Sequence, residues 1–185
     1  MACEALVSKI QQLLSQTVKI YPDGMKTIKA VLSNDIEVEN DVETMLVSPN
    51  NNYNLDLDLK CTTFKSTDLG VAFLIEDHGT LIYHAGDLND WVWDEESDAY
   101  NQKMTEDYHY EINLLLTYLN NREIDVSFVV LDPRQEQDYH RGMCYFLDHI
   151  SSKVVYPMHY WDDPTIIEKF FKEYPQYKHQ IYKTE

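Results

Sequence analysis

Hydrophobic and polar positions alternate in the first half of the chain, which predicts a series of short strands. The clearest case is the range 54–64, where Leu55, Leu57, Leu59 and Cys61 alternate with polar side chains. A period of two predicts a strand with one buried face. Further strands are expected at 27–32, 44–48, 70–76 and 80–84, and a tight Asp-His-Gly turn joins the last two as a hairpin.

Helical periodicity becomes the main pattern in the second half of the chain. A long helix is expected over 97–121, with an apolar stripe of Ile112, Leu115, Leu116 and Leu119. Residues 85–96 carry few helix signals and predict a loop. Other helices are expected at 5–14, 136–150 and 164–174, and other strands at 126–131, 153–156 and near 181–182. Antiparallel strands followed by strand–helix alternation favour an α/β (α+β layered) fold with outer helices.

Length and charge narrow the class of protein. The 185 residues suit a single domain over 1–185, and 15 basic against 32 acidic residues leave a net charge of −17. Such a chain repels phosphate backbones and anionic bilayers, so we expect no nucleic-acid or membrane partner. Three widely spaced cysteines without CxxC spacing and an N-terminus without a long apolar run favour a cytoplasmic protein.

The most informative segment for function is residues 83–91, where a predicted strand ends at His84. Gly86 lets the backbone turn without a Cβ clash, and Asp87 then stands at the mouth of the strand. A carboxylate at a rigid strand end beside an open loop is well placed to hold a divalent metal. The alternative is that Asp87 caps the loop through neighbouring backbone amides. Spacing alone leaves both interpretations open.

A second strand ends in the range 154–163, where Pro157 turns the chain and brings His159 to a similar edge. Imidazole is a common metal ligand and a general base near neutral pH. The alternative is an ordinary core or interface histidine beside aromatic residues. The chain has no GxGxxG, GxxxxGK[ST], GxSxG or HExxH motif, so other familiar catalytic signatures do not compete with these two segments.

Three motifs in a fixed order carry a resemblance to a known family. They are STDLGVAF at 66–73, IYHAGDLNDWVWDEE at 82–96 and KVVYPMHYWDD at 153–163. Together they resemble motifs of the metallo-β-lactamase superfamily, and are most similar to a subgroup of small bacterial hydrolase-like proteins. The resemblance runs from about Ile28 to about Tyr174. It implies a partial αββα sandwich with the site at one edge of the paired sheets.

The resemblance also implies roles for individual residues. Asp87 matches the aspartate that bridges two metals, and His159 matches the last histidine ligand. His84 is not a ligand position in the family and is expected to support a ligand, whereas Asp68 is a candidate substitute for a middle histidine ligand. The implied cofactor is zinc, manganese or iron, and the implied reaction is hydrolysis of a small-molecule ester, amide, lactone or phosphoester.

The sequence departs from the family at the HxHxDH motif, which is absent. The chain is expected to begin just after this motif and so to lack the first strands of the fold. One carboxylate and one imidazole fall short of the roughly three protein ligands that a catalytic ion needs. We therefore expect a metal-dependent hydrolase that is inactive or impaired as this chain, with the metal either bound or absent.

Two other hypotheses remain open. One is a non-catalytic binding or oligomerisation module, in which a second copy or a partner covers the exposed sheet edge. Its supporting feature is the aromatic set Trp91, Trp93, Tyr160 and Trp161, because such residues are enriched in interface cores. The other is a single-metal enzyme that uses Asp87 and His159 together with His84 or Asp68.

Overall fold

A computed structural model describes residues 30–33 and 44–182, and the chain divides into two compact units. The first comprises residues 1–48 with 184–185, and the second comprises residues 49–183. Within the first unit, β1 (Ala30–Ser33) pairs in parallel with β2 (Thr44–Val47), in agreement with two predicted strands. The helix predicted at 5–14 lies outside the described residues, and a single domain over 1–185 stays a prediction.

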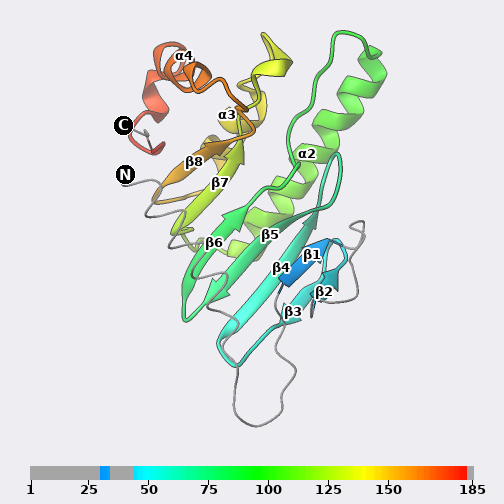
Figure 1. Ribbon diagram of the computed structural model, residues 1–185, viewed down its shortest axis with the longest axis vertical. Helices are drawn as coiled ribbons and strands as arrows, with labels where there is room; N and C mark the ends of the chain where they lie inside the picture. Colours follow the sequence, from blue (N-terminus) through cyan, green and yellow to red (C-terminus); the bar gives the residue numbers. More distant parts are fainter. Residues whose placement is uncertain (1–29, 34–43, 183–185) are drawn as a thin grey trace. The chain divides into compact units, whose positions relative to one another are not determined.

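A six-stranded mixed sheet forms the centre of the second unit (Figure 1). Its strands lie side by side in chain order, antiparallel from β3 to β6 and parallel from β6 to β8. The fold class is therefore mixed α/β, as expected. The strands are β3 (Asn52–Asn54), β4 (Leu59–Lys65), β5 (Val71–Asp77), β6 (Thr80–His84), β7 (Val126–Val130) and β8 (Val155–Met158).

Three helices accompany this sheet, and the longest begins and ends with recognisable caps. The helices are α2 (Asp98–Leu119), α3 (Arg141–His149) and α4 (Thr165–Glu173), with 3-10 turns η1 (Pro133–Gln135) and η2 (Pro175–Tyr177). The Ser97 hydroxyl accepts a hydrogen bond from the Tyr100 amide at the start of α2, and Asn120 ends it in the left-handed conformation. None of the described helices combines the length and apolar character needed to cross a membrane.

The main core lies between one face of the sheet and the helices. Strand register places Leu74, Tyr83, Ser127 and Val155 in one row across β5 to β8, and all four are buried. The Tyr83 ring stacks on Phe146 of α3 with the ring centroids 5.4 Å apart. Other buried core members are Ile112, Leu115 and Leu119 of α2 and Met143 of α3. This packing anchors the strands whose ends carry the candidate site.

The hairpin between β5 and β6 agrees with its prediction, and the strand predicted over 54–64 is confirmed from Leu59 onward but not over residues 55–58. The chain forms a turn after β3 and only then enters β4 at Leu59. The Asp56 carboxylate accepts the Leu57 amide at 2.7 Å, and the Leu55 amide donates to the Leu59 carbonyl at 2.9 Å. Leu57 is 93% exposed. Backbone bonds to Leu59 close the turn where alternation alone predicted a strand, and the Asp56 carboxylate caps the Leu57 amide inside it.

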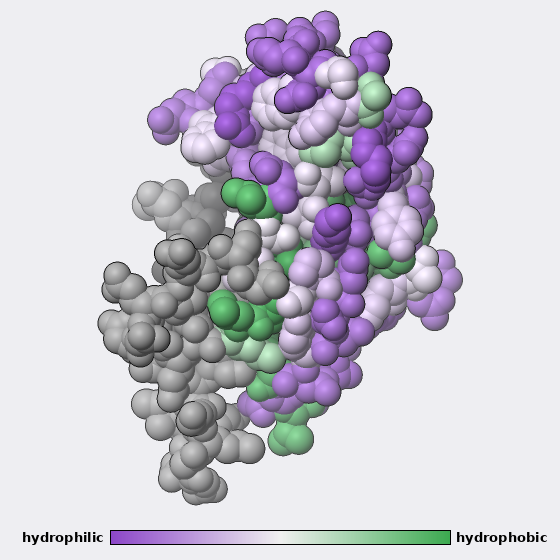
Figure 2. Space-filling model, turned by 90° about the vertical axis from the view of Figure 1, so that its right-hand side faces the viewer, coloured by the Kyte–Doolittle hydropathy of each residue, from purple (hydrophilic) through white to green (hydrophobic). Residues whose placement is uncertain are grey.

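Two helix predictions also need correction. Leu116 is exposed, and the buried stripe of α2 instead includes Tyr108 and Glu111. The helix predicted over 136–150 begins only at Arg141, because η1 ends in a Glu136 of positive φ (48°) and residues 136–140 form turns. On the outside, the face in Figure 2 is largely hydrophilic with separate hydrophobic patches, as expected for such an acidic chain.

Candidate metal centre at the strand ends

The topology gathers four chain segments at one edge of the sheet. Because β6, β7 and β8 are parallel, their carboxyl ends meet there, and the start of antiparallel β5 lies at the same edge. At this end of the sheet, cross-strand pairing aligns four residues of β5 to β8, namely Phe73, His84, Phe128 and Tyr156. The segments that follow or precede it are residues 66–70, 85–93, 131–136 and 159–163.

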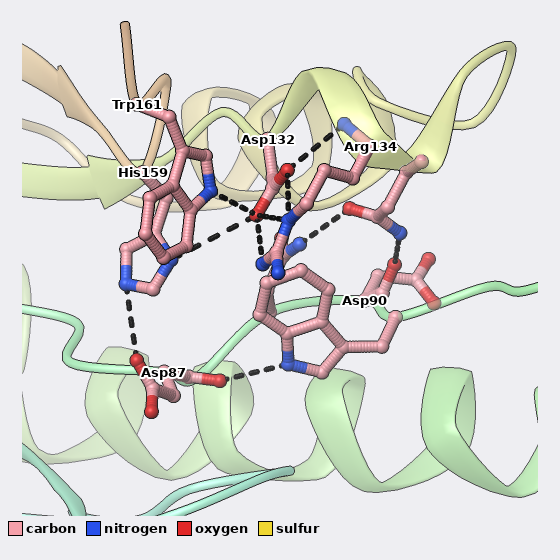
Figure 3. A network of polar contacts seen from close by, with 9 residues as sticks. Asp87, Asp90, Asp132, Arg134, His159 and Trp161 are labelled. Atoms are coloured by element: carbon pink, nitrogen blue, oxygen red, sulfur yellow. Dashed lines mark hydrogen bonds and ion pairs between the residues drawn. The ribbon is translucent and has the colours of Figure 1, made fainter.

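Asp87 and His159 lie against one another at this edge (Figure 3). The His159 Nε2 atom is 3.0 Å from Asp87 Oδ1, and the two side chains are 24% and 34% exposed. The structure thus brings together the two residues that the sequence singled out, from the ends of two strands that are not neighbours. Their role as metal ligands stays a prediction.

The loop that carries Asp87 is pressed against the sheet at Gly86. This glycine has φ +56°, and a Cβ there would lie 2.7 Å from the Val71 carbonyl oxygen at the start of β5. The next turn is closed by the Trp91 indole, whose Nε1 donates to the Asp87 carbonyl at 2.9 Å. Glycine is needed at position 86, because another residue would be strained at this φ and its Cβ would clash with the Val71 carbonyl oxygen.

A buried polar network holds the same loop from behind. Asn89 Nδ2 donates to the Gln135 side chain at 2.7 Å, and the Thr67 hydroxyl donates to the Asn89 carbonyl at 2.7 Å. The Asp90 carboxylate accepts from the Thr105 hydroxyl at 2.6 Å and from Arg141 Nε at 3.1 Å. The loop is thereby tied to β4–β5, η1, α2 and α3, so the Asp87 carboxylate stands on a rigid support.

The turn that carries His159 has an unusual backbone. His159 and Trp161 have φ angles of 64° and 52°, a conformation that non-glycine residues adopt at a cost. The Trp161 Nε1 donates to Asp132 Oδ2 at 3.3 Å. The His159 Nδ1 is buried 3.8 Å from the same oxygen, beyond hydrogen-bond length, and has no hydrogen-bond partner among the described residues.

Asp132 is the buried acidic centre of this edge. It follows β7, is fully buried, and accepts hydrogen bonds from Arg134 Nε at 2.9 Å, from Arg134 Nη2 and from the Arg134 amide at 2.9 Å. Burial by itself would raise the pKa of Asp132, but the bonds from Arg134 and Trp161 outweigh it and hold the pKa below its usual value. The carboxylate is therefore ionised at neutral pH.

Sequence reasoning missed Asp132 and Arg134. A signal was present, because Leu-Asp-Pro-Arg follows a predicted buried strand just as Asp87 and His159 follow theirs. Parallel strands bring such strand ends together. The bond from Trp161 to Asp132, in contrast, joins residues far apart in the chain and could not be inferred from spacing.

His84 and Asp68 lie near the pair without being bonded to it in the described part of the chain. His84 Nδ1 accepts the Gly86 amide at 3.0 Å. Removal of water by the surrounding protein lowers the pKa of His84, although part of the residue is exposed. The nearby His159 lowers this pKa further, whereas the Asp87 charge raises it. The Asp68 charge contributes with that of Asp87 to raising the pKa of Arg134, whose main cause is its bond to Asp132. Ligand roles for His84 and Asp68 stay predictions.

Over residues 30–33 and 44–182, no group of three or more His, Cys, Asp or Glu side chains is arranged to hold a metal ion. Asp87 and His159 have the right donor chemistry, a carboxylate and an imidazole, but as a pair they are incomplete. Cys61 and Cys144 are free thiols, and burial raises the pKa of each to about 12, so neither offers a ready thiolate ligand.

Comparison with known proteins finds similarity in solved structures only. No protein-family model and no curated protein sequence matches the chain. A Thermotoga maritima protein described as belonging to the metallo-beta-lactamase superfamily is 16% identical, with a TM-score of 0.45 over 78% of this chain and 68% of its own. A mutant of the CmlA beta-hydroxylase is 10% identical, with a TM-score of 0.48 over 78% of this chain and 33% of its own.

The third structure is Zn²⁺-bound PqqB from Methylobacterium extorquens, 14% identical, with a TM-score of 0.42 over 76% of this chain and 50% of its own. This chain thus spans between a third and about two thirds of the lengths of these proteins. At such low identity the similarity concerns the fold alone.

Proposed function

We propose that the edge formed by Asp87 and His159 is part of a divalent-metal centre of the metallo-β-lactamase hydrolase type, and that this chain by itself is impaired as a hydrolase. The observation that carries the proposal is the 3.0 Å approach of the His159 imidazole to the Asp87 carboxylate. Two ligand-type groups from separate strand ends meet at an edge that is open to solvent.

The residues around Asp87 and His159 hold both side chains in positions suited to binding a metal ion. Gly86 and the Asn89–Asp90 network hold the Asp87 carboxylate in place, and the His159 turn directs Nε2 toward it. Asp132 is ionised and lies 3.8 Å from His159 Nδ1, so each nitrogen of the imidazole has a carboxylate nearby, Asp87 at Nε2 and Asp132 at Nδ1. A bound divalent cation would supply acidification of water and stabilisation of negative charge on a substrate oxygen.

The proposed impairment follows from the number of ligands. A catalytic ion commonly has about three protein ligands, and the described residues supply two that meet. We expect such a site to bind metal weakly and to turn over substrate slowly.

The test is metal binding to the full chain by isothermal titration calorimetry after removal of bound metal with a chelator. Zn²⁺, Mn²⁺ and Fe²⁺ are compared, and Asp87→Asn or His159→Gln is expected to weaken binding at least about tenfold. Asp58→Asn, at an exposed carboxylate in the turn before β4, is the matched control and should change nothing. Unchanged binding in Asp87→Asn would overturn the assignment of the site.

The proposed impairment as a hydrolase is tested with chromogenic ester and phosphodiester substrates in the presence of each metal. We expect only slow turnover above that of free metal. Tight, near-stoichiometric metal binding together with efficient turnover that requires Asp87 would show that the chain is not impaired.

A second candidate function is a non-catalytic module that assembles with another copy of the chain. It is favoured by two large apolar side chains at the same edge, Leu69 and Trp161, which are 66% and 62% exposed. Light scattering should then give a dimer or higher state that Leu69→Ser or Trp161→Ser weakens. A monomer at micromolar concentration would argue against this candidate.

A further inference from the structure

Arg134 has a bonding edge that its partner Asp132 does not use. The Asp132 carboxylate is bound side-on, through Nε and Nη2 of the guanidinium. The third nitrogen, Nη1, has no hydrogen-bond partner among the described residues, and the side chain is 52% exposed. A guanidinium held in this way keeps its outer fork, Nη1 and the second Nη2 hydrogen, available for another oxyanion.

Aromatic rings fix the plane of this guanidinium. Its central carbon lies 4.7 Å from the Trp161 ring centroid and 6.0 Å from that of Trp93. Trp93 in turn stacks on Trp91, with centroids 5.7 Å apart and an interplanar angle of 8°. Because Asp132 and the rings restrict its rotation, Arg134 loses little conformational freedom when it binds a ligand.

An exposed aromatic ring lies beside the free fork. Trp161 is 62% exposed although its Nε1 is bonded to Asp132, so much of its ring faces solvent. Leu69, 66% exposed, belongs to the turn that precedes β5 at the same sheet edge. A fixed cation next to exposed apolar side chains is suited to a ligand with one anionic end and a flat apolar body.

We infer that Arg134 and Trp161 form a binding site for an aromatic carboxylate, with the carboxylate on the outer guanidinium fork and the ring against the Trp161 indole. Figure 3 shows both residues grouped around Asp132 beside the Asp87–His159 pair. The binding site itself requires no metal. That an aromatic carboxylate is also a substrate rests on the proposed hydrolase function.

Nearby charge predicts how strong this binding is. Arg134 is offset by Asp132, and Asp68 and Asp87 add negative charge close by. We therefore expect dissociation constants near the millimolar range for a simple aromatic carboxylate. A divalent cation at Asp87 and His159 would reduce the repulsion and tighten binding.

The test uses the full chain and its own tryptophan fluorescence, with benzoate as the probe and benzyl alcohol as the uncharged analogue. The chain contains three tryptophans, Trp91, Trp93 and Trp161, and all three lie at this edge, so the signal reports locally. We expect saturable quenching by benzoate, little by benzyl alcohol, and at least about tenfold weaker benzoate binding in Arg134→Lys.

Arg134→Lys keeps a cation beside buried Asp132, so folding is retained while the fork is lost. Arg122→Lys is the matched control, because Arg122 pairs with Glu76 elsewhere on the molecule and should leave binding unchanged. Equal binding of benzoate to the wild type and Arg134→Lys, or equal binding of benzyl alcohol, would overturn the inference. Absence of saturable benzoate binding would overturn it as well.

A parallel titration with Zn²⁺ separates the two proposals. If Zn²⁺ tightens benzoate binding in the wild type but not in Asp87→Asn, both are supported. If benzoate binding depends on Arg134 while calorimetry shows no Zn²⁺ binding that depends on Asp87, the carboxylate site stands and the proposed metal centre is contradicted.

Discussion

The imidazole of His159 lies 3.0 Å from the carboxylate of Asp87, although their strands, β8 and β6, are separated in the sheet by β7. The two side chains meet across the end of the intervening strand, directly beside buried Asp132. This contact is therefore a product of the whole sheet rather than of either loop alone. The partial exposure of both side chains decides how much the pair contributes to the free energy of unfolding.

We expect Asp87→Asn to change the free energy of unfolding by about 1 kcal/mol or less, because both side chains are partly exposed and such pairs contribute little. Urea denaturation followed by circular dichroism measures this in metal-free protein. A loss of more than about 2 kcal/mol would mean that the pair is a structural element instead of an accessible site.

Gly142→Ala should be strongly destabilising even though alanine is the better helix former. A Cβ at this position in α3 would lie 1.8 Å from Asn89 Oδ1 and 3.1 Å from the Asp90 amide nitrogen. We expect a loss of about 1–3 kcal/mol, which exceeds the gain of about 1 kcal/mol from helix propensity.

The comparison variant is Gly79→Ala in the β5–β6 turn. No atom lies within 4 Å of its Cβ position, and the cost there is only that of φ +85°, about 1–2 kcal/mol. Thermal unfolding of both variants, together with metal binding, separates the effects. Only Gly142→Ala should also weaken the Asp87 site, because it displaces the network behind that loop.

Arg134→Ala should cost about 3 kcal/mol, because it leaves the fully buried Asp132 carboxylate without its main partner. Asp132→Asn in the same chain removes the uncompensated charge and should restore part of the loss. Urea midpoints of the single and double variants measure the coupling. Additive effects would contradict the pairing.

Asp125 should contribute stability that is lost in acid. The bond from Lys153 Nζ at 2.6 Å, and then that from the Leu81 amide at 2.8 Å, hold the pKa of Asp125 below its usual value. Since the folded pKa lies below the unfolded value of about 3.9, the contribution is present above that pH and disappears as pH falls through the folded pKa. Asp125→Asn and Lys153→Gln should each flatten the acid limb of a stability–pH curve.

Glu111 should show the opposite sign. Burial raises the pKa of Glu111, although the Lys65 amide donates to its carboxylate at 3.1 Å. The folded state therefore holds this proton more tightly, and stability falls as pH rises from about 4.3 through the folded pKa. Glu111→Gln keeps an acceptor for the Lys65 amide and should remove this decline. If the variant kept the full decline between those pH values, another group would be responsible.

Sequence reasoning succeeded where local chemistry decides the structure. The Asp77–Gly79 turn is one example, because His78 and Gly79 both adopt positive φ angles of 49° and 85°, as two-residue hairpin turns require. It failed at residues 55–58, where alternation is identical for a strand and for a turn closed by Asp56. Periodicity cannot distinguish these two, since the backbone bonds from Leu55 and Asp56 to the Leu59 carbonyl leave no mark on the pattern of side chains.

The candidate site divides in the same way. Asp87 and His159 were singled out as candidates because each follows a strand and stands in a motif that resembles a known family, and both properties are visible in the chain itself. Arg134 was not, because its importance depends on Asp132 being buried and on Trp161 arriving from another turn. Such meetings depend on the folded sheet, which no single segment encodes.

The left-handed backbone of His159 sets stability and function against each other. Glycine would occupy this φ of 64° without the steric cost that any other residue pays there. A chain optimised only to fold would therefore place glycine after Met158, and His159→Gly would relax the turn while deleting the imidazole. If the proposed metal centre is correct, His159→Gly should therefore raise the free energy of unfolding while it abolishes metal binding at this edge.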